Sequence, residues 1–189
     1  FMPIKEDSYI VVAQRLEEDL RSKIVRSVIS EFEGKKLDFL SNSNEYFDAA
    51  KVFYYHEQWN LCLIQSVIAM ESALAGLVFN SDATKFYLSR KTKNLDSLRK
   101  MYKEAQGLPQ KIMKFLFPLI KELNLSEAQS ELRRIMPLIN HKKREDGIYD
   151  LRSKVIHEGI SITKNQAEQS VEIVPQFLRI LNIINSNVA

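Results

Sequence analysis

The chain has almost no cysteine, the residue whose disulfides stabilise small secreted domains. Among its 189 residues there is one cysteine, Cys62. A single cysteine excludes an internal disulfide framework and is typical of proteins kept in a reducing compartment, so we expect a cytoplasmic location. The first residues contain no basic region followed by an apolar run, so we expect no secretory signal. The longest apolar stretch, around residues 61–79, is interrupted by polar side chains and predicts a buried helix, with no membrane partner.

Several site motifs are also absent. The five glycines form neither GxGxxG nor GxxxxGK[ST], which excludes nucleotide-binding loops of those two kinds. There is no HExxH, no CxxC and no clustered His/Asp set, so we expect no metal and no cofactor. The formal net charge of +3 is a mild basic bias, which permits a nucleic-acid partner without arguing for one.

Helical spacing of apolar residues is present along nearly the whole chain and predicts an all-α fold. Helices are expected at residues 45–56, 59–79, 95–106, 109–123, 126–141, 149–159 and 163–184, with a charged connector at residues 80–94 that contains a short helical turn. A further helix is expected to run from Asp7 or Ser8 to Gly34. The Ser/Asn-rich segment at residues 37–44 is the best candidate for a boundary between an N-terminal helical extension, residues 1–40, and a helical domain, residues 41–189.

Two features of these helices lead to specific expectations. Pro118, Pro137 and Pro175 each fall inside an apolar pattern and predict kinks or breaks. The 59–79 helix is apolar nearly all round, which predicts that it is the centre of a bundle. It also carries a face of small residues that would let another helix approach closely, either from the same chain or from a second subunit. These residues are Cys62, Ser66, Ala69, Ala73 and Gly76.

The segment YDLRSKVIHEG, residues 149–159, contains an R-x-x-x-x-H pattern formed by Arg152 and His157. Alone the pattern means little, but here it lies late in a helical chain, just before a final amphipathic helix. With QSVIAMESAL at residues 65–74, it resembles the HEPN superfamily (higher eukaryotes and prokaryotes nucleotide-binding), and within it the Apea-like branch. The resemblance covers roughly residues 46–184 and leaves the first helix outside.

The resemblance implies a HEPN-type helical bundle that forms a homodimer. In active members, Arg and His from both subunits line a cleft and cleave RNA without metal. Carried over to this chain, Arg152, His157 and the neighbouring Ser153 would be catalytic residues of an endoribonuclease, in the role of a toxin or defence effector with a protein antitoxin or regulatory partner. Other members are non-catalytic modules that bind a nucleotide, RNA or protein. Gly159 stands where one toxin branch has a modifiable Tyr, which argues against that form of regulation.

The chemistry of the pair fits RNA cleavage, but its spacing poses a geometric problem. Attack by the RNA 2′-hydroxyl needs a base of near-neutral pKa and a cation for the phosphorane charge, which His157 and Arg152 can provide. Five residues of α-helix turn through about 500°, which leaves the two side chains about 140° apart. The pair can therefore act together only if the helix ends near His157, at Gly159, or if a second subunit contributes. The plain alternative is a surface helix with Arg152 in an ion pair and His157 favoured by the helix dipole.

Other charged residues have both a functional and a structural interpretation. Glu71 has apolar helical neighbours, so three interpretations are open. It orients the site through a cation such as Arg152 or Lys154, it is exposed with its stem over apolar surface, or it forms a purely structural ion pair, which we favour. The basic clusters SRKTK, residues 89–93, and HKKR, residues 141–144, are either phosphate-binding or solvated loop charges, which we favour. HKKR is the better candidate for an RNA-binding rim because it lies close to the motif, and its cations are Lys142, Lys143 and Arg144.

Overall fold

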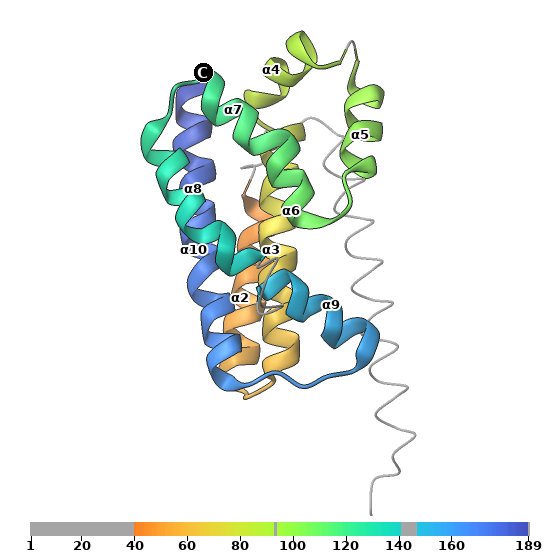
Figure 1. The fold of residues 1–189 in the computed structure, drawn as a ribbon, viewed down its shortest axis with the longest axis vertical. Helices are drawn as coiled ribbons and strands as arrows, with labels where there is room; N and C mark the ends of the chain where they lie inside the picture. The colour runs from red at the N-terminus through yellow and green to blue at the C-terminus, as the bar shows by residue number, and fades with distance from the viewer. Residues whose placement is uncertain (1–39, 93, 141–146, 189) are drawn as a thin grey trace, which may run out of the picture. The chain divides into compact units, whose positions relative to one another are not determined.

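A computed structural model of the chain describes residues 40–92, 94–140 and 147–188, which all lie in one compact unit, Asp38–Ala189 (Figure 1). All regular structure in these ranges is helical, with no strand, and this confirms the all-α prediction. The helix expected from Asp7 or Ser8 to Gly34 lies outside the described residues, as does the extension 1–40 except for its last residue.

The helices follow one another closely along the chain. They are α2 Ser41–Tyr55, α3 Trp59–Phe79, α4 Ala83–Arg90, α5 Leu95–Glu104, α6 Gly107–Lys111, the π-helical turn η1 Ile112–Leu116, α7 Phe117–Glu122, α8 Ser126–Ile139, α9 Ile148–Glu158 and α10 Lys164–Val188.

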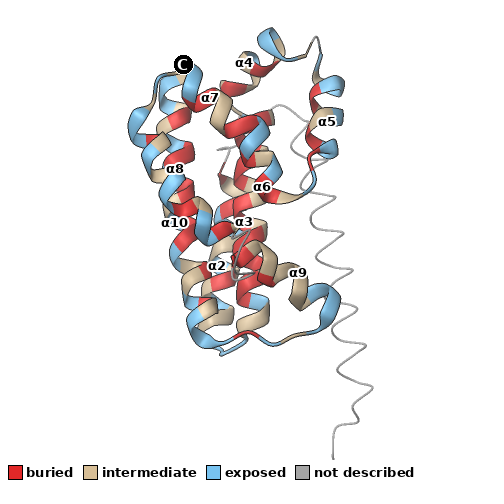
Figure 2. Ribbon diagram, in the orientation of Figure 1, coloured by how far each residue is buried: buried red, intermediate tan, exposed pale blue. Residues whose placement is uncertain are grey.

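The central element is α3, as predicted from its apolar surface. Helices α2 and α10 pack along it, and α9, α4 and α6 also contact it. By length and composition α3 could cross a membrane, but 67% of its most apolar window is buried within the fold, as in the core helix of a folded domain. Figure 2 shows buried residues concentrated on α3 and on the facing sides of its neighbours.

The small-residue face of α3 is covered by helices of the same chain. Toward α10, the Ser170 hydroxyl donates to Ser66 Oγ at 3.2 Å, and Cys62 Sγ lies 3.9 Å from the Ser170 hydroxyl. Toward α2, the buried Ser43 hydroxyl donates to the Ala69 carbonyl at 2.8 Å. Close approach of α2 and α10 therefore accounts for the small residues without a second subunit.

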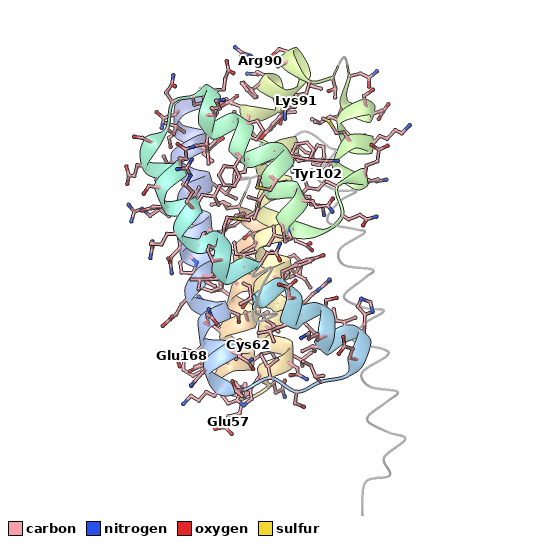
Figure 3. The ribbon with its side chains drawn as sticks, in the orientation of Figure 1. Glu57, Cys62, Arg90, Lys91, Tyr102 and Glu168 are labelled. Carbon is pink, nitrogen blue, oxygen red and sulfur yellow. The ribbon has the colours of Figure 1, made fainter. Side chains whose placement is uncertain are left out.

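The helix from α6 to α7 contains the irregularity that Pro118 requires. Proline has no N–H, so it cannot donate to the carbonyl four residues earlier, that of Lys114. The Lys91 ammonium donates to this carbonyl at 2.7 Å, and the Tyr87 hydroxyl donates to the neighbouring Phe115 carbonyl at 3.0 Å. Two side chains that lie in and just after α4 thus satisfy carbonyls around the π-helical turn, where Figure 3 labels Lys91.

Some predicted boundaries were wrong. Helix α2 begins at Ser41, four residues earlier than predicted, so residues 41–44 are helical and are not a turn. The 80–94 connector contains an eight-residue helix, α4, which is longer than the single turn expected. Helices α8 and α10 continue through Pro137 and Pro175, so of the predicted kinks or breaks at these two residues the breaks are absent.

Candidate functional site

The R-x-x-x-x-H motif lies on a single helix, α9. Its end agrees with the prediction, because Gly159 follows the last helical residue in the left-handed conformation, with φ of 67°. Helix α9 packs on α3 and also contacts α8 and α10 (Figure 1). The motif is therefore held against the central helix of the fold.

Arg152 and His157 occupy different environments on α9. Arg152 is half-buried, and its Nε is enclosed with no hydrogen-bond partner among the described residues. His157 is exposed in the last turn of α9. The helix does end near His157, as expected, but His157 is itself still helical, so the end at Gly159 does not by itself turn its side chain toward Arg152. Helical geometry consequently keeps the two side chains about 140° apart within one chain.

The remaining predicted site residues are only partly placed. Ser153 and Lys154 are both half-buried on α9 beside Arg152, and Lys154 is engaged in an interaction. Lys142, Lys143 and Arg144 lie outside the described residues, so the predicted RNA-binding rim stays a prediction.

Glu71 on α3 belongs to the same electrostatic neighbourhood as Arg152. Burial raises the pKa of Tyr149 on α9, the charge of Glu71 raises it further, and the charge of Arg152 lowers it. Glu71 also raises the pKa of Tyr102 on α5, after the larger effect of burial. The structure thus places Glu71 in the electrostatic surroundings of Tyr149 and Tyr102, and its role, structural or orienting, stays a prediction.

Tyr149 anchors the motif helix to the start of α6, and the sequence reasoning missed this contact. Gly107 has a φ of 70°, and a Cβ on it would overlap the hydroxyl and ring of Tyr149. Glycine is therefore required at position 107 by its backbone conformation and by the close approach of the ring. The signal in the sequence was a glycine between two predicted helices, with nothing to indicate its distant partner.

Asn60 in the first turn of α3 fixes the segment that follows the motif. Its Nδ2 donates to the Ile160 carbonyl at 3.1 Å, and its Oδ1 accepts from the Ile162 amide at 3.0 Å. One side-chain amide therefore pairs with a backbone carbonyl and a backbone amide of residues 160–162, in the segment between α9 and α10. The sequence reasoning missed Asn60, because its partners lie a hundred residues further along the chain.

Within the described ranges, no group of three or more His, Cys, Asp and Glu side chains could hold a metal ion. Comparison of the chain with protein-family models, with curated proteins and with solved structures gives no match. The fold defines the chain as an all-helical protein, and its function is inferred from α9 and the residues that contact it.

Proposed function

We propose that the chain is a HEPN-type, metal-independent endoribonuclease that acts as a homodimer. The observation that carries the proposal is the hydrogen bonding of Arg152 and the exposure of His157, the two motif residues on α9. Arg152 retains an enclosed donor that has no partner among the described residues, and His157 is exposed at the end of the same helix. Burying an unsatisfied donor costs free energy, and a bound anion would offset this cost.

The proposed reaction uses the RNA's own 2′-hydroxyl as nucleophile. His157 removes the proton from this hydroxyl, whose oxygen attacks the adjacent phosphorus. The bond from phosphorus to the 5′-oxygen breaks, that oxygen takes a proton from His157, which the first step has protonated, and a 2′,3′-cyclic phosphate is left. Arg152 stabilises the charge that develops on the phosphoryl oxygens, and Ser153 assists by hydrogen bonding.

A second copy of the chain is needed because one helix cannot bring both groups to one phosphate. A two-fold axis beside α9 would place Arg152 of one chain next to His157 of the other. Ile156, which precedes His157, is 45% exposed and offers apolar surface for such a contact. A monomer should therefore be a poor catalyst.

The separation of Arg152 and His157 within one chain also favours a second function. A non-catalytic HEPN module would use the half-buried Arg152 to bind a nucleotide, RNA or protein partner and would leave His157 unused. Nucleotide that co-purifies with the protein, together with intact RNA in a cleavage assay, would support this alternative.

The test is RNA cleavage in the presence of a chelator. The proposal predicts that the full chain cleaves generic single-stranded RNA in excess EDTA and leaves cyclic phosphate ends. The His157→Ala and Arg152→Ala variants should be inactive, while His56→Ala, at an exposed histidine outside the motif, should keep full activity. Intact RNA at high protein concentration, equal to the His157→Ala control, would contradict the proposal.

A further inference from the structure

The positive charge of the chain is concentrated in one stretch. Residues 82–122 contain ten Lys and Arg against four Asp and Glu, whereas the rest of the chain contains 17 against 20. The net charge of +3 therefore hides a basic segment that comprises α4 to α7 and an acidic remainder. Such a segment attracts anions, provided that its cations are not already paired.

The cations of the SRKTK cluster that the structure describes are used within the fold. Arg90 forms an ion pair with Glu122, and Lys91 donates to the Lys114 carbonyl. Burial lowers the pKa of Lys91, as expected for an ammonium that is partly withdrawn from water. These two side chains stabilise the packing of α4 and are poor candidates for a ligand-binding surface.

The cations of α5 are differently placed. Lys100 and Lys103 are exposed, and neither forms an ion pair with another residue of the described ranges. They are three residues apart, which makes them neighbours on the helix surface. Leu98 and Tyr102 hold another side of α5 in the core, with Tyr102 about 100° around the helix from Lys103.

Lys111 on α6 adds a third cation beside α5. Its Nζ lies 4.8 Å from the centroid of the Tyr102 ring, a cation–π contact that fixes the ammonium next to α5. Figure 3 labels Tyr102, where α5 faces the α6 region. We call Lys100, Lys103 and Lys111 the α5–α6 basic surface.

Gly107 connects α5 and α6 with the motif helix α9. Gly107 lies between Lys103 and Lys111 in the sequence and touches the Tyr149 ring. Tyr149 in turn interacts electrostatically with Arg152, one turn further along α9. The cations of α5 and α6 are thus linked to Arg152 through the Gly107–Tyr149 contact.

We propose that the α5–α6 basic surface binds the phosphate backbone of a single-stranded nucleic acid and leads it to Arg152. This proposal rests on the proposed function, because it assumes that Arg152 binds a nucleic acid. Lysine ammonium groups, exposed at Lys100 and Lys103 and half-buried at Lys111, bind phosphates as point charges without reading sequence, so the binding should be tolerant of sequence and sensitive to salt. Helices α5 and α6 expose no large hydrophobic side chain, which a membrane-surface helix would need.

The experiment measures the binding of a fluorescent oligouridylate by anisotropy over a series of salt concentrations. The full chain carries His157→Ala so that the RNA stays intact. Replacing all three surface lysines with Gln should weaken binding at least tenfold at low salt. It should also reduce the slope of log K against log salt by about 2, since each contacted phosphate of a single strand contributes about 0.7. A triple Lys→Arg variant keeps the charges and should keep both values.

The matched control removes the same charge outside α5 and α6, with the exposed residues Lys121, Arg133 and Lys164 replaced by Gln. An equal loss of affinity and slope in this control would overturn the proposal, because net charge alone would then explain binding. No binding by the parent, or lysine-dependent binding only to vesicles of anionic lipid, would also overturn it.

The two proposals can fail separately. If the surface lysines bind RNA as predicted but the wild-type chain leaves RNA intact, the binding surface stands and the nuclease function fails. If the wild-type chain cleaves RNA and the triple Gln variant binds with an unchanged slope, the nuclease function stands and the binding surface fails.

Discussion

Gly107 and Tyr149 form the contact that holds the beginning of the motif helix. Both Gly107 and Gly159 have a positive φ, of 70° and 67°, so an alanine is strained at either position. Only at Gly107 would the added Cβ meet another group, because nothing lies within 4 Å of the corresponding position at Gly159. Comparing an alanine at Gly107 with an alanine at Gly159 therefore separates the cost of backbone strain from the cost of displacing the Tyr149 ring.

We predict that Gly107→Ala lowers the free energy of unfolding by about 2–3 kcal/mol and Gly159→Ala by about 1 kcal/mol. Urea denaturation measures both values. In a Tyr149→Ala background the cost of Gly107→Ala should fall to that of Gly159→Ala, because the overlapping ring is gone. Equal costs for the two glycines in the wild-type background would show that the Tyr149 contact does not constrain α9.

Tyr87 links stability to pH through its buried hydroxyl. Burial raises the pKa of Tyr87 above its ordinary value of 10.0, so above pH 10 the unfolded chain loses this proton before the folded chain does. The contribution of Tyr87 to stability is complete below that pH and decreases as the pH rises toward the folded-state pKa.

We predict that Tyr87→Phe costs about 1 kcal/mol at neutral pH, because the Phe115 carbonyl loses a hydrogen bond. The difference from wild type should shrink above about pH 10, since phenylalanine does not ionise. Urea denaturation at neutral and alkaline pH measures this change. Tyr55→Phe serves as the control, because Tyr55 is 82% exposed and should show neither effect. A Tyr87→Phe difference that stays constant with pH would contradict the account.

At the scale of secondary structure, Asn60 connects the start of α3 to the segment between α9 and α10. Asn60→Ala removes two hydrogen bonds that fix Ile160 and Ile162. We predict a loss of about 1–2 kcal/mol in stability and faster hydrogen exchange at the Ile162 amide. Gln58→Ala is the control, because this neighbouring side chain makes no capping hydrogen bond. Unchanged exchange at Ile162 would mean that the chain after Gly159 is held by other contacts.

Helices with strong local signals were predictable from the sequence. The bounds of α3 and the end of α9 at Gly159 follow from apolar spacing and from a glycine stop signal. The early start of α2, the length of α4 and the π-helical turn did not follow, because distant side chains stabilise them. Ser43 bonds to α3, and Lys91 and Tyr87 satisfy carbonyls more than twenty residues away. Local sequence patterns do not predict contacts with residues so far along the chain.

At the scale of the whole molecule, the candidate site also combines features that local sequence predicts with features that depend on distant contacts. The motif and its helix were read directly from residues 149–159. The contacts of the motif helix depend on how α3, α6 and α9 pack. The contact between Gly107 and Tyr149 was therefore not predicted from the sequence. The fold also shows that the small face of α3 is occupied by α2 and α10, so a dimer would have to use another surface, such as the exposed end of α9.

The central claim is that Arg152 and His157 act together across two chains, and complementation between variants tests it most directly. Arg152→Ala and His157→Ala chains are each expected to be inactive alone. When the two are co-expressed and purified as a mixed dimer, one of the two sites should contain an intact Arg152 and an intact His157 from different chains. The account predicts that RNA cleavage in EDTA returns in the mixed dimer. A mixed dimer that is no more active than either variant alone would contradict it.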